Sequence, residues 1–480
     1  CPTVNIFQAG HLPGLDPTTL QWFDLGAREH ACAGVQVPVL SPEQVRQVCR
    51  RVQQQAALHL RTMSLADIMR VIDQAVARLL DPTDPARQRL NDWLARVTGL
   101  STDMVSLNLT RYLKTFRAQG LSRFVTEDLP NPWVLDRFQP LAKGGSGMAL
   151  GPNLLLHLWA GNVPALSLWS LVCGLLVKAG NVGKLASAEP IFATVFVQVL
   201  IDIEPRWRDA LALLWWEGGD TAPEAAACAD ATCVIAYGSD DTLQALRSRL
   251  PTGVRLLAHG HKLSFGVLAA SALGVRHGPE LALAAAQDVA RYDQGGCYSP
   301  HVFYVQNGGR ITPQEWAERL FHAVQNQNAR HPRRPLSAAE ALACAKWRQT
   351  HEWSGQARLM SGQGGDVVFH AAPQNLSPGP GQRCVQVMAF DHLEQVLSSI
   401  APARRWLQTA GLAVTPEDWP RWAQQLGLAG VTRLSAVGAM TAPEAGWHHD
   451  GGHSLRDLLN WVEVEQSLQD AAEAYAPYAD

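Results

Sequence analysis

The sequence predicts an α/β protein in which helices cover both faces of a parallel β-sheet. From residue 154 onward, short apolar segments alternate with longer segments whose apolar residues recur at helical spacing. Strands that alternate with helices form parallel sheets, and their ligands bind at the carboxyl ends of the strands. The chain has 480 residues, of which 47% are hydrophobic, so it is long enough for two or three domains rather than one.

The first 150 residues predict a different, mainly helical organisation. Residues 1–40 indicate short strands and turns. A helix is expected from Ser41 to Leu60, because Ser41 suits the cap, Pro42 the first turn, and Gln44 returns to the cap. Further helices are expected from Ser64, over 85–100 and over 101–118. The glycine-rich 143–147 segment is expected to be a loop and a domain boundary.

Beyond this boundary the expected elements alternate. Strands are predicted over 154–159, 182–186, 211–215, 232–237 and 254–257, and helices over 165–178, 191–201 and 240–250. A second α/β region follows at about 262–434. It is expected to hold strands 263–268 and 301–305, a helix over 280–292, and helices after Thr312 and Ser337. An exposed turn is predicted at 377–381, and a last strand at 461–464.

Charge and cysteine content narrow the function classes. The formal net charge is −3 and no tract is rich in Lys or Arg, so the composition gives no reason to expect nucleic acid as a partner. The nine cysteines are scattered without a Cys-x-x-Cys pair, which favours a reducing, cytoplasmic compartment over a disulfide framework. The N-terminal sequence CPTVNIFQAG has neither the charged start nor the apolar core of a signal peptide.

One uncharged stretch, residues 152–177, is long enough in principle to cross a bilayer. Gly161-Asn162-Val163-Pro164 interrupts it in the middle. We therefore expect a buried strand, a tight turn and a buried helix rather than an integral membrane span.

Among the cysteines, Cys297 has the most suggestive surroundings. It lies in Tyr292-Asp293-Gln294-Gly295-Gly296-Cys297, where a helix is expected to end just before a strand. Two glycines permit dihedral angles and close approaches that side chains forbid, so a nucleophile there would stand on a rigid turn. The same pattern also fits an unreactive buried thiol.

The turn Trp159-Ala160-Gly161-Asn162-Val163-Pro164 connects an expected strand to an expected helix. Its Asn162 amide could face a developing oxyanion. The alternative is that Asn162 caps the helix, with Pro164 near the first helical position.

A dinucleotide would fit two other strand ends. Lys184 is expected at the end of one strand, and Gly238-Ser239 at the next strand-to-helix turn, where a helix N-terminus accepts phosphate. A Gly-x-Gly-x-x-Gly motif does not follow any strand, which argues against an ordinary Rossmann dehydrogenase.

Histidines gather in two places, His259-Gly260-His261 and Trp447-His448-His449-Asp450-Gly451-Gly452-His453. Neither has the spacing of a zinc motif, so the sequence predicts polar turns near the active site or a subunit contact, and no metal.

Several segments, in order along the chain, resemble the LuxC family of acyl-CoA reductases, a branch of the aldehyde dehydrogenase superfamily. They are Ala160–Pro164, the Ser170–Lys178 segment, Gly260–Lys262 with Ser264–Gly266, Asp293–Gln294 with Gly296–Cys297 and Ser299–His301, and Trp447–Gly451. The first 120 residues match no motif of the family. The resemblance implies an aldehyde-dehydrogenase-like fold with a Rossmann-type cofactor domain, an α/β catalytic domain and a small oligomerisation arm.

The resemblance also implies domain limits. Residues 1–140 and 154–257 would bind NADPH, residues 258–434 would be the catalytic domain, and residues 141–153 with 435–480 would form the arm and C-terminal strand. By analogy with the superfamily, the protein is expected to be a homo-oligomer.

The implied activity is the NADPH-dependent reduction of an acyl thioester to an aldehyde. Cys297 matches the nucleophile and Asn162 the oxyanion-hole asparagine. The cofactor-binding positions implied are Trp159, Ala160, Gly161, Lys184, Ser187, Gly238 and Ser239. Relatives that prefer NAD carry a glutamate where this chain has Ser187, and a serine tolerates a 2′-phosphate that a carboxylate would repel, so NADPH is favoured.

One departure of this chain from the superfamily's sequence pattern bears on which product is formed. Oxidising aldehyde dehydrogenases carry Glu-Leu-Gly-Gly-Lys, whose glutamate activates water, whereas this chain reads Ala258-His259-Gly260-His261-Lys262. Reduction of an acyl-cysteine needs no such water. We expect a Cys297 thiolate favoured by nearby amide dipoles, and His259 or His261 as the proton donor.

Three alternatives remain open from the sequence. They are an aldehyde dehydrogenase that makes acids, a cysteine acyltransferase or thioesterase without nicotinamide, and an inactive partner subunit. The acyl donor could be coenzyme A, a carrier protein or an acyl-protein synthetase partner.

Overall fold

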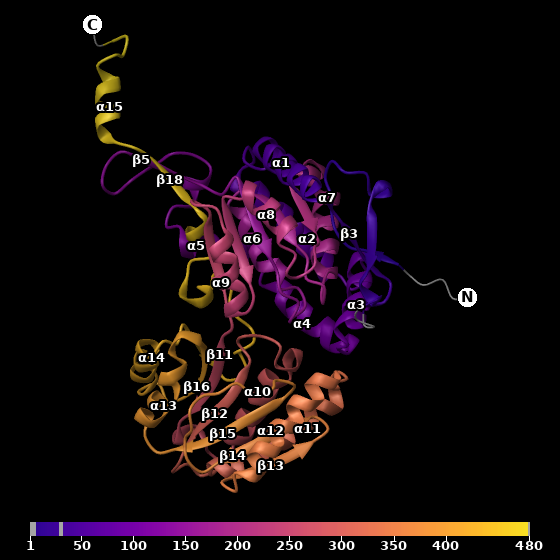
Figure 1. The fold of residues 1–480 in the computed structure, drawn as a ribbon. Coiled ribbons are helices and arrows are strands. Elements are labelled where there is room, and N and C mark those ends of the chain that lie inside the picture. The colour runs from indigo at the N-terminus through magenta and orange to yellow at the C-terminus, as the bar shows by residue number, and fades with distance from the viewer. Residues whose placement is uncertain (1–5, 28–31, 479–480) are drawn as a thin grey trace.

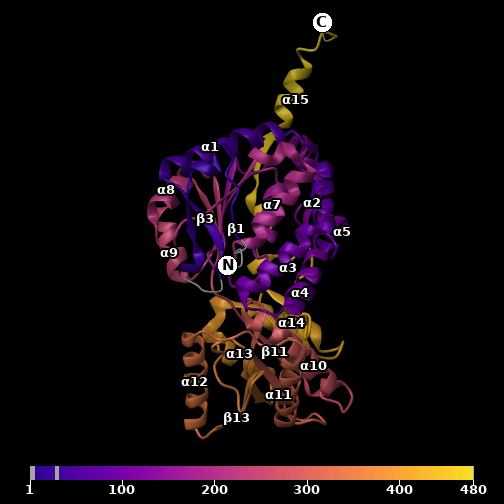
Figure 2. The same ribbon diagram turned by 90° about the vertical axis from the view of Figure 1, so that its right-hand side faces the viewer.

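The computed structural model describes residues 6–27 and 32–478, in which two α/β layers are stacked one above the other (Figures 1 and 2). The upper layer is built on a five-stranded parallel sheet of order β10-β9-β6-β7-β8. Its strands are β6 (Leu154–Leu158), β7 (Gly180–Lys184), β8 (Leu211–Leu214), β9 (Cys233–Tyr237) and β10 (Arg255–His259). The parallel sheet expected from the alternating pattern is confirmed.

Helices cover both faces of this sheet because successive strand residues point to opposite sides. On one face, β-strand residues such as Leu154 and Leu156 pack with α1 (Pro42–His59), α8 (Thr221–Asp230) and α9 (Asp240–Arg249). On the other face, Leu155 and its neighbours pack with α2 (Leu65–Leu80), α3 (Pro85–Thr98), α4 (Thr102–Lys114), α6 (Ser167–Leu176) and α7 (Ile191–Ile203). The N-terminal helices predicted from capping and periodicity are therefore part of this layer.

Helix α1 begins where its capping box predicts. The Ser41 hydroxyl accepts from the backbone N–H of Gln44, and the Gln44 side chain accepts from the backbone N–H of Ser41. A small sheet of order β1-β3-β2, made of β1 (Phe7–Gln8), β2 (Gln21–Asp24) and β3 (Val35–Val39), precedes this helix. Helix α5 (Ala118–Asp128) was not predicted, since the expected helix before it ended at residue 118.

The lower layer is a seven-stranded sheet of order β13-β14-β15-β12-β11-β16-β17, parallel except at β13. Its strands are β11 (Leu263–Leu268), β12 (Pro300–Gln306), β13 (Ala357–Gly362), β14 (Gly365–His370), β15 (Cys384–Phe390), β16 (Leu407–Ala413) and β17 (Arg433–Ala436). Helices α10 (His277–Ala290) and α11 (Pro313–Arg330) pack on one face, and α13 (Leu393–Ile400) and α14 (Trp419–Leu428) on the other. Helix α12 (Ala338–Trp353) packs near β13.

An antiparallel sheet of order β18-β5-β4 extends from the upper layer, and α15 (Gln466–Glu473) projects beyond it (Figure 1). Its strands are β4 (Gln139–Pro140), β5 (Ser146–Leu150) and β18 (Asn460–Val464). The loop predicted over 143–147 is wrong at its end, because Ser146 and Gly147 pair with Val464 and Glu463 of β18. Backbone pairing with a strand more than 300 residues away outweighs the local glycine signal.

The uncharged 152–177 stretch forms β6, a turn and α6, as expected. Over residues 6–27 and 32–478, no helix combines the length and apolarity needed to cross a bilayer. The domain limits at residues 140, 257 and 434 stay a prediction.

Candidate active site

Cys297 lies in the connection between α10 and β12 of the lower layer, where it lines a cleft. The 3-10 turn Arg291–Gln294 precedes it, and Tyr292, Asp293 and Gln294 all have left-handed backbone angles, with φ of 49°, 51° and 64°. The prediction that the glycines supply the unusual dihedrals is wrong, because Gly295 is right-handed with φ of −68°. Gly295 is needed for space instead: a Cβ there would lie 2.7 Å from the carbonyl oxygen of Asn162.

Buried polar contacts hold this left-handed turn. The Arg383 guanidinium donates to the Asp293 carboxylate at 2.7 Å, and both side chains are at most 1% exposed. The other Asp293 oxygen accepts from the backbone N–H of Arg334. The Gln294 amide donates to the carbonyls of Pro300 and Cys384. These contacts tie the turn to β15, so the lower sheet determines where the cysteine stands.

The Cys297 thiol faces a chain of polar side chains. The Gln408 amide nitrogen, on β16, lies 3.3 Å from Sγ of Cys297 and 2.7 Å from Oδ1 of Asp450. Because an amide nitrogen carries two N–H bonds, it can donate to both atoms at once. The Ser264 hydroxyl donates to the Cys297 carbonyl at 2.8 Å and fixes the backbone.

The electrostatics of the thiol differ from the expectation. Burial raises the pKa of Cys297 to about 11, and the negative charge of Asp450 adds to this, while Gln408 and the backbone N–H groups of Cys297 and Tyr298 act in the opposite direction. The predicted amide dipoles are therefore present, but desolvation outweighs them. The prediction of a favoured thiolate is wrong, and a base must remove the thiol proton.

The next group along this chain is an Asp–His pair. Oδ2 of Asp450 lies 2.8 Å from Nδ1 of His259. Burial acts to raise the pKa of Asp450, but the hydrogen bond from His259 and the neighbouring His449 outweigh it and hold the pKa well below its usual range. An ionised carboxylate at Nδ1 fixes the tautomer in which Nε2 of His259 carries the lone pair.

Aromatic rings hold His259 in place. Its imidazole stacks on His449, with ring centroids 4.1 Å apart, and on Tyr237, at 4.9 Å. Burial and the neighbouring His259 lower the pKa of His449 to about 3, so His449 is neutral and acts as a spacer. His259 is thereby oriented as a base or acid candidate.

Asn162 is brought beside the cysteine turn from the upper layer. Its side-chain nitrogen donates to the Gly295 carbonyl at 2.8 Å. It does not cap the helix, because α6 begins at Ser167 after Leu166, and Ala165 adopts a left-handed φ of 62°. The second N–H of the amide remains as a donor for the cleft that Asn162 lines.

A cleft of about 1030 Å³ lies between the two layers. Cys297, Asn162, His259, His261, Tyr237 and Asp450 contribute to its walls, and so do Ala160, Gly238 and Ser239. The carboxyl ends of β9 and β10 face it, as expected for a parallel α/β sheet.

Comparisons with known proteins decide the family. The family model described as "Acyl-CoA reductase (LuxC)" matches residues 60–461. The chain belongs to the LuxC family. Curated relatives include a long-chain acyl-protein thioester reductase of Photobacterium phosphoreum, 27% identical over 388 residues (78% of this chain and 75% of that protein). Another is long-chain acyl-protein thioester reductase 2 of Photobacterium leiognathi, 24% identical over 391 residues (78% and 77%).

Solved structures give the fold. Aldehyde dehydrogenase 21 from Physcomitrella patens, in complex with succinate, superposes with a TM-score of 0.74 at 14% identity, over 96% of this chain and 98% of that chain. An oxidoreductase from Marinobacter aquaeolei gives a TM-score of 0.74 at 15% identity, over 97% and 99%. The expected family and the aldehyde-dehydrogenase-like fold are confirmed, and this LuxC-family chain is an oxidoreductase that acts on acyl thioesters.

The residues predicted to bind the cofactor in this LuxC-family chain fall into two groups. Ala160, Gly238 and Ser239 line the cleft. Trp159 and Gly161 do not, and both have packing roles: the Trp159 ring covers Gly183 and donates to Ser170, and a Cβ on Gly161 would lie 2.8 Å from Cβ of Ala188. Their assignment as cofactor contacts stays a prediction.

Lys184 and Ser187 lie farther along the same sheet edge, outside the cleft lining. Burial lowers the pKa of Lys184. The Ser187 hydroxyl accepts a hydrogen bond from the indole N–H of Trp215 at 3.0 Å. The hydroxyl proton of Ser187 therefore points away from Trp215 and can be donated to another group.

Of the two candidate proton donors, only His259 is joined to Asp450. His261 is exposed on the cleft wall. Sequence analysis missed Gln408, Asp450 and Arg383 as site residues. Asp450 belongs to a motif that was noted, but its contact with His259 spans 191 residues and no local spacing shows it.

Proposed function

We propose that this chain reduces an acyl thioester to an aldehyde with NADPH, through an acyl group carried on Cys297. The observation that carries the proposal is the meeting of three groups in one cleft: the Cys297 thiol, the Asn162 amide and the Asp450–His259 pair. A nucleophile, an oxyanion donor and an oriented base are the parts that acyl transfer to cysteine requires.

The first half-reaction forms the acyl-enzyme. His259 accepts the thiol proton, and the sulfur of Cys297 attacks the thioester carbon. The second N–H of Asn162 and the Cys297 backbone N–H donate to the oxyanion, contacts of a kind worth about 3–4 kcal/mol each. The bond from carbon to the donor's sulfur then breaks, and the donor leaves as a thiol with the proton returned by His259.

The second half-reaction needs a hydride, which a nicotinamide supplies when it is bound. The acyl carbon of the acyl-cysteine is reduced, and the oxygen is again held by Asn162. The carbon–sulfur bond to Cys297 breaks, the aldehyde is released, and the Cys297 thiolate takes up a proton from solvent through His259, which regenerates the thiol. Ala258 stands where oxidising relatives carry a water-activating glutamate, which favours reduction over hydrolysis.

The donor set at the carboxyl edge of the five-stranded sheet suits the cofactor. Gly238 and Ser239 precede the N-terminus of α9, Lys184 is the last residue of β7, and Ser187 follows that strand. An ammonium, a hydroxyl donor and a helix N-terminus together match the hydroxyl and phosphate groups of a dinucleotide. NADPH rather than NADH is proposed because Ser187 can donate to a 2′-phosphate that a carboxylate would repel.

The acyl donor is proposed to be a coenzyme A thioester. Exposed cations on α4 and α5, Arg111, Lys114 and Arg123, line the cleft, with Glu444 as an exposed carboxylate in the same lining. The three cations suit the phosphates of coenzyme A.

The combined replacement of Arg111, Lys114 and Arg123 by alanine should raise KM for acyl-CoA about tenfold and leave KM for the phosphate-free acyl-pantetheine unchanged. Equal rises for both substrates would contradict this assignment.

The decisive experiment follows NADPH consumption and aldehyde formation with acyl-CoA substrates of increasing chain length. The wild type should consume one NADPH for each aldehyde formed. Cys297→Ala should neither consume NADPH nor form aldehyde. Acid formation from an aldehyde and NAD(P)+ without added thiol would support the oxidising alternative. Acylation of Cys297 without NADPH consumption would support an acyltransferase or thioesterase.

The protein is also proposed to be a homo-oligomer that pairs through its arm. Trp461 and Val462 of β18 are more than 40% exposed, on the edge strand of the three-stranded sheet. An exposed apolar edge strand favours pairing with another chain. Light scattering of Trp461→Asp/Val462→Asp should give a smaller species than the wild type if this is correct.

A further inference from the structure

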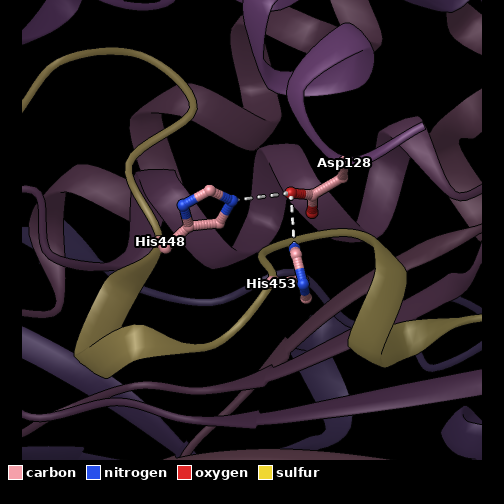
Figure 3. Close-up of side chains that lie close together, drawn as sticks. All are labelled: Asp128, His448 and His453. Carbon is pink, nitrogen blue, oxygen red and sulfur yellow. Dashed lines mark hydrogen bonds and ion pairs between the residues drawn. The ribbon is translucent and has the colours of Figure 1, made fainter. Parts of the chain in front are cut away.

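Two histidines from one loop converge on one carboxylate outside the catalytic cleft. His448 and His453 belong to the segment before β18, and Asp128 is the last residue of α5 (Figure 3). Oδ1 of Asp128 lies 3.3 Å from Nδ1 of His453 and 3.6 Å from Nε2 of His448. Both imidazole rings point at the same oxygen (Figure 3).

The spacing of these three atoms matches a metal site. They all lie within 4.8 Å of one another. Tetrahedral zinc with bonds of about 2.0–2.1 Å places its ligand atoms about 3.4 Å apart. The separations of 3.3 and 3.6 Å from Oδ1 of Asp128 to the two imidazole nitrogens lie on either side of that value.

The second oxygen of Asp128 is already engaged. Oδ2 accepts from the backbone N–H groups of Leu455, at 2.6 Å, and Arg456, at 3.2 Å. A carboxylate that is hydrogen-bonded through one oxygen and turned to the histidines with the other has the arrangement of a supported metal ligand. The carboxylate itself is 2% exposed, so its charge needs compensation.

A hydrogen bond does not account for the orientation of the His448 imidazole. Its Nε2 is buried and has no hydrogen-bond partner among the described residues, since 3.6 Å to Asp128 and 3.9 Å to Glu127 exceed hydrogen-bond length. The buried nitrogen has no hydrogen-bond partner, yet it is directed at a carboxylate that a second imidazole also approaches. This arrangement is expected when the three groups are ligands of one cation.

We propose that Asp128, His448 and His453 bind a divalent transition-metal ion, with zinc as the preferred metal. Two imidazole nitrogens and one carboxylate oxygen favour Zn²⁺ over Mg²⁺ or Ca²⁺, which take oxygen ligands. Three protein ligands leave the fourth tetrahedral position for water or for Glu127, whose Oε1 lies 3.9 Å from Nε2 of His448.

The site connects α5 to the segment that completes the active site. His449 and Asp450, which follow His448 directly, face the catalytic cleft and hold His259. Metal at His448 and His453 therefore clamps the segment on both sides of Asp450. We expect the metal to stabilise this segment and not to take part in the chemistry.

The test is metal binding by the full-length protein. After treatment with a chelator, the wild type is titrated with Zn²⁺ against a chromophoric competitor, and it should bind one equivalent. His448→Ala and His453→Ala should each weaken binding by more than about 100-fold, because each removes a direct ligand. His322→Ala, an exposed histidine on α11, is the matched control and should bind like the wild type.

Two further variants separate ligation from loss of structure. His453→Cys should keep the metal and, with Co²⁺ in place of Zn²⁺, show a thiolate-to-cobalt charge-transfer band. Asp450→Asn tests the other group of three ligand atoms, His259, His449 and Asp450. The proposal is wrong if the wild type binds Zn²⁺ no more tightly than His448→Ala/His453→Ala, or if Asp450→Asn abolishes binding that His448→Ala retains.

Discussion

Replacing Asp450 with Asn should make the Cys297 thiol more reactive while making the enzyme slower. The Gln408 amide nitrogen lies 3.3 Å from the sulfur and 2.7 Å from the carboxylate, so charge and sulfur are within about 6 Å. Two unit charges at that separation repel by about 0.7 kcal/mol in water and about 2.8 kcal/mol at a dielectric constant of 20. Asn also tolerates the left-handed backbone at this position, where φ is 53°.

The assay is alkylation of Cys297 by iodoacetamide, followed by mass spectrometry across pH. Because burial and Asp450 raise the Cys297 pKa to about 11, the wild-type rate should keep rising with pH beyond pH 9. Removal of the charge raises the thiolate fraction, but a more acidic thiol is a weaker nucleophile, so the net gain is about 2- to 15-fold near pH 8. Turnover should fall, because His259 loses the carboxylate that orients it.

The matched control is a variant that should change the alkylation rate of Cys297 in the opposite direction. Gln408→Leu removes the N–H donor that stabilises the thiolate, so its alkylation should be slower than that of the wild type. If Asp450→Asn alkylates no faster than the wild type, the carboxylate does not set the thiol pKa and the electrostatic argument fails.

Three other substitutions test the supports of the site. Arg383→Met leaves the buried Asp293 carboxylate without its partner and should lower the free energy of unfolding by about 3–5 kcal/mol, measured by urea denaturation; a loss under 1 kcal/mol would contradict the burial argument. Gly295→Ala places a Cβ 2.7 Å from the Asn162 carbonyl and should lower kcat more than it raises KM; unchanged kcat would show that the two loops separate freely. Ser187→Glu should raise KM for NADPH by about 10- to 100-fold relative to NADH, and an unchanged ratio would remove Ser187 from cofactor selection.

The sequence predicted elements well where the signal was local. The capping box at Ser41 and Gln44 located the start of α1, and strand β11 has the predicted limits of Leu263 and Leu268. Both depend on neighbouring residues and on the burial of a short apolar run. The strand at 461–464 was predicted as well, although most of its residues are exposed.

What the sequence could not predict depends on contacts between distant residues. The Cys297 pKa is set by burial and by Asp450, which is 153 positions away, and neither is visible from the local Gly-Gly-Cys pattern. The carboxylate that meets His448 and His453 is Asp128, more than 300 residues earlier in the chain. Metal motifs are recognised by the spacing of ligands that are close together in the sequence. The two histidines alone do not have such a spacing, so the sequence predicted no metal.

The three left-handed residues before Cys297 have a consequence for biosynthesis. Such conformations cost about 1–3 kcal/mol each and persist only where surrounding structure enforces them. Here the enforcing partner, Arg383, emerges from the ribosome 86 residues after Cys297. A nascent chain that already carries the cysteine thus lacks the turn that places Cys297 beside Asn162, and catalysis at this cysteine cannot begin until synthesis has passed β15.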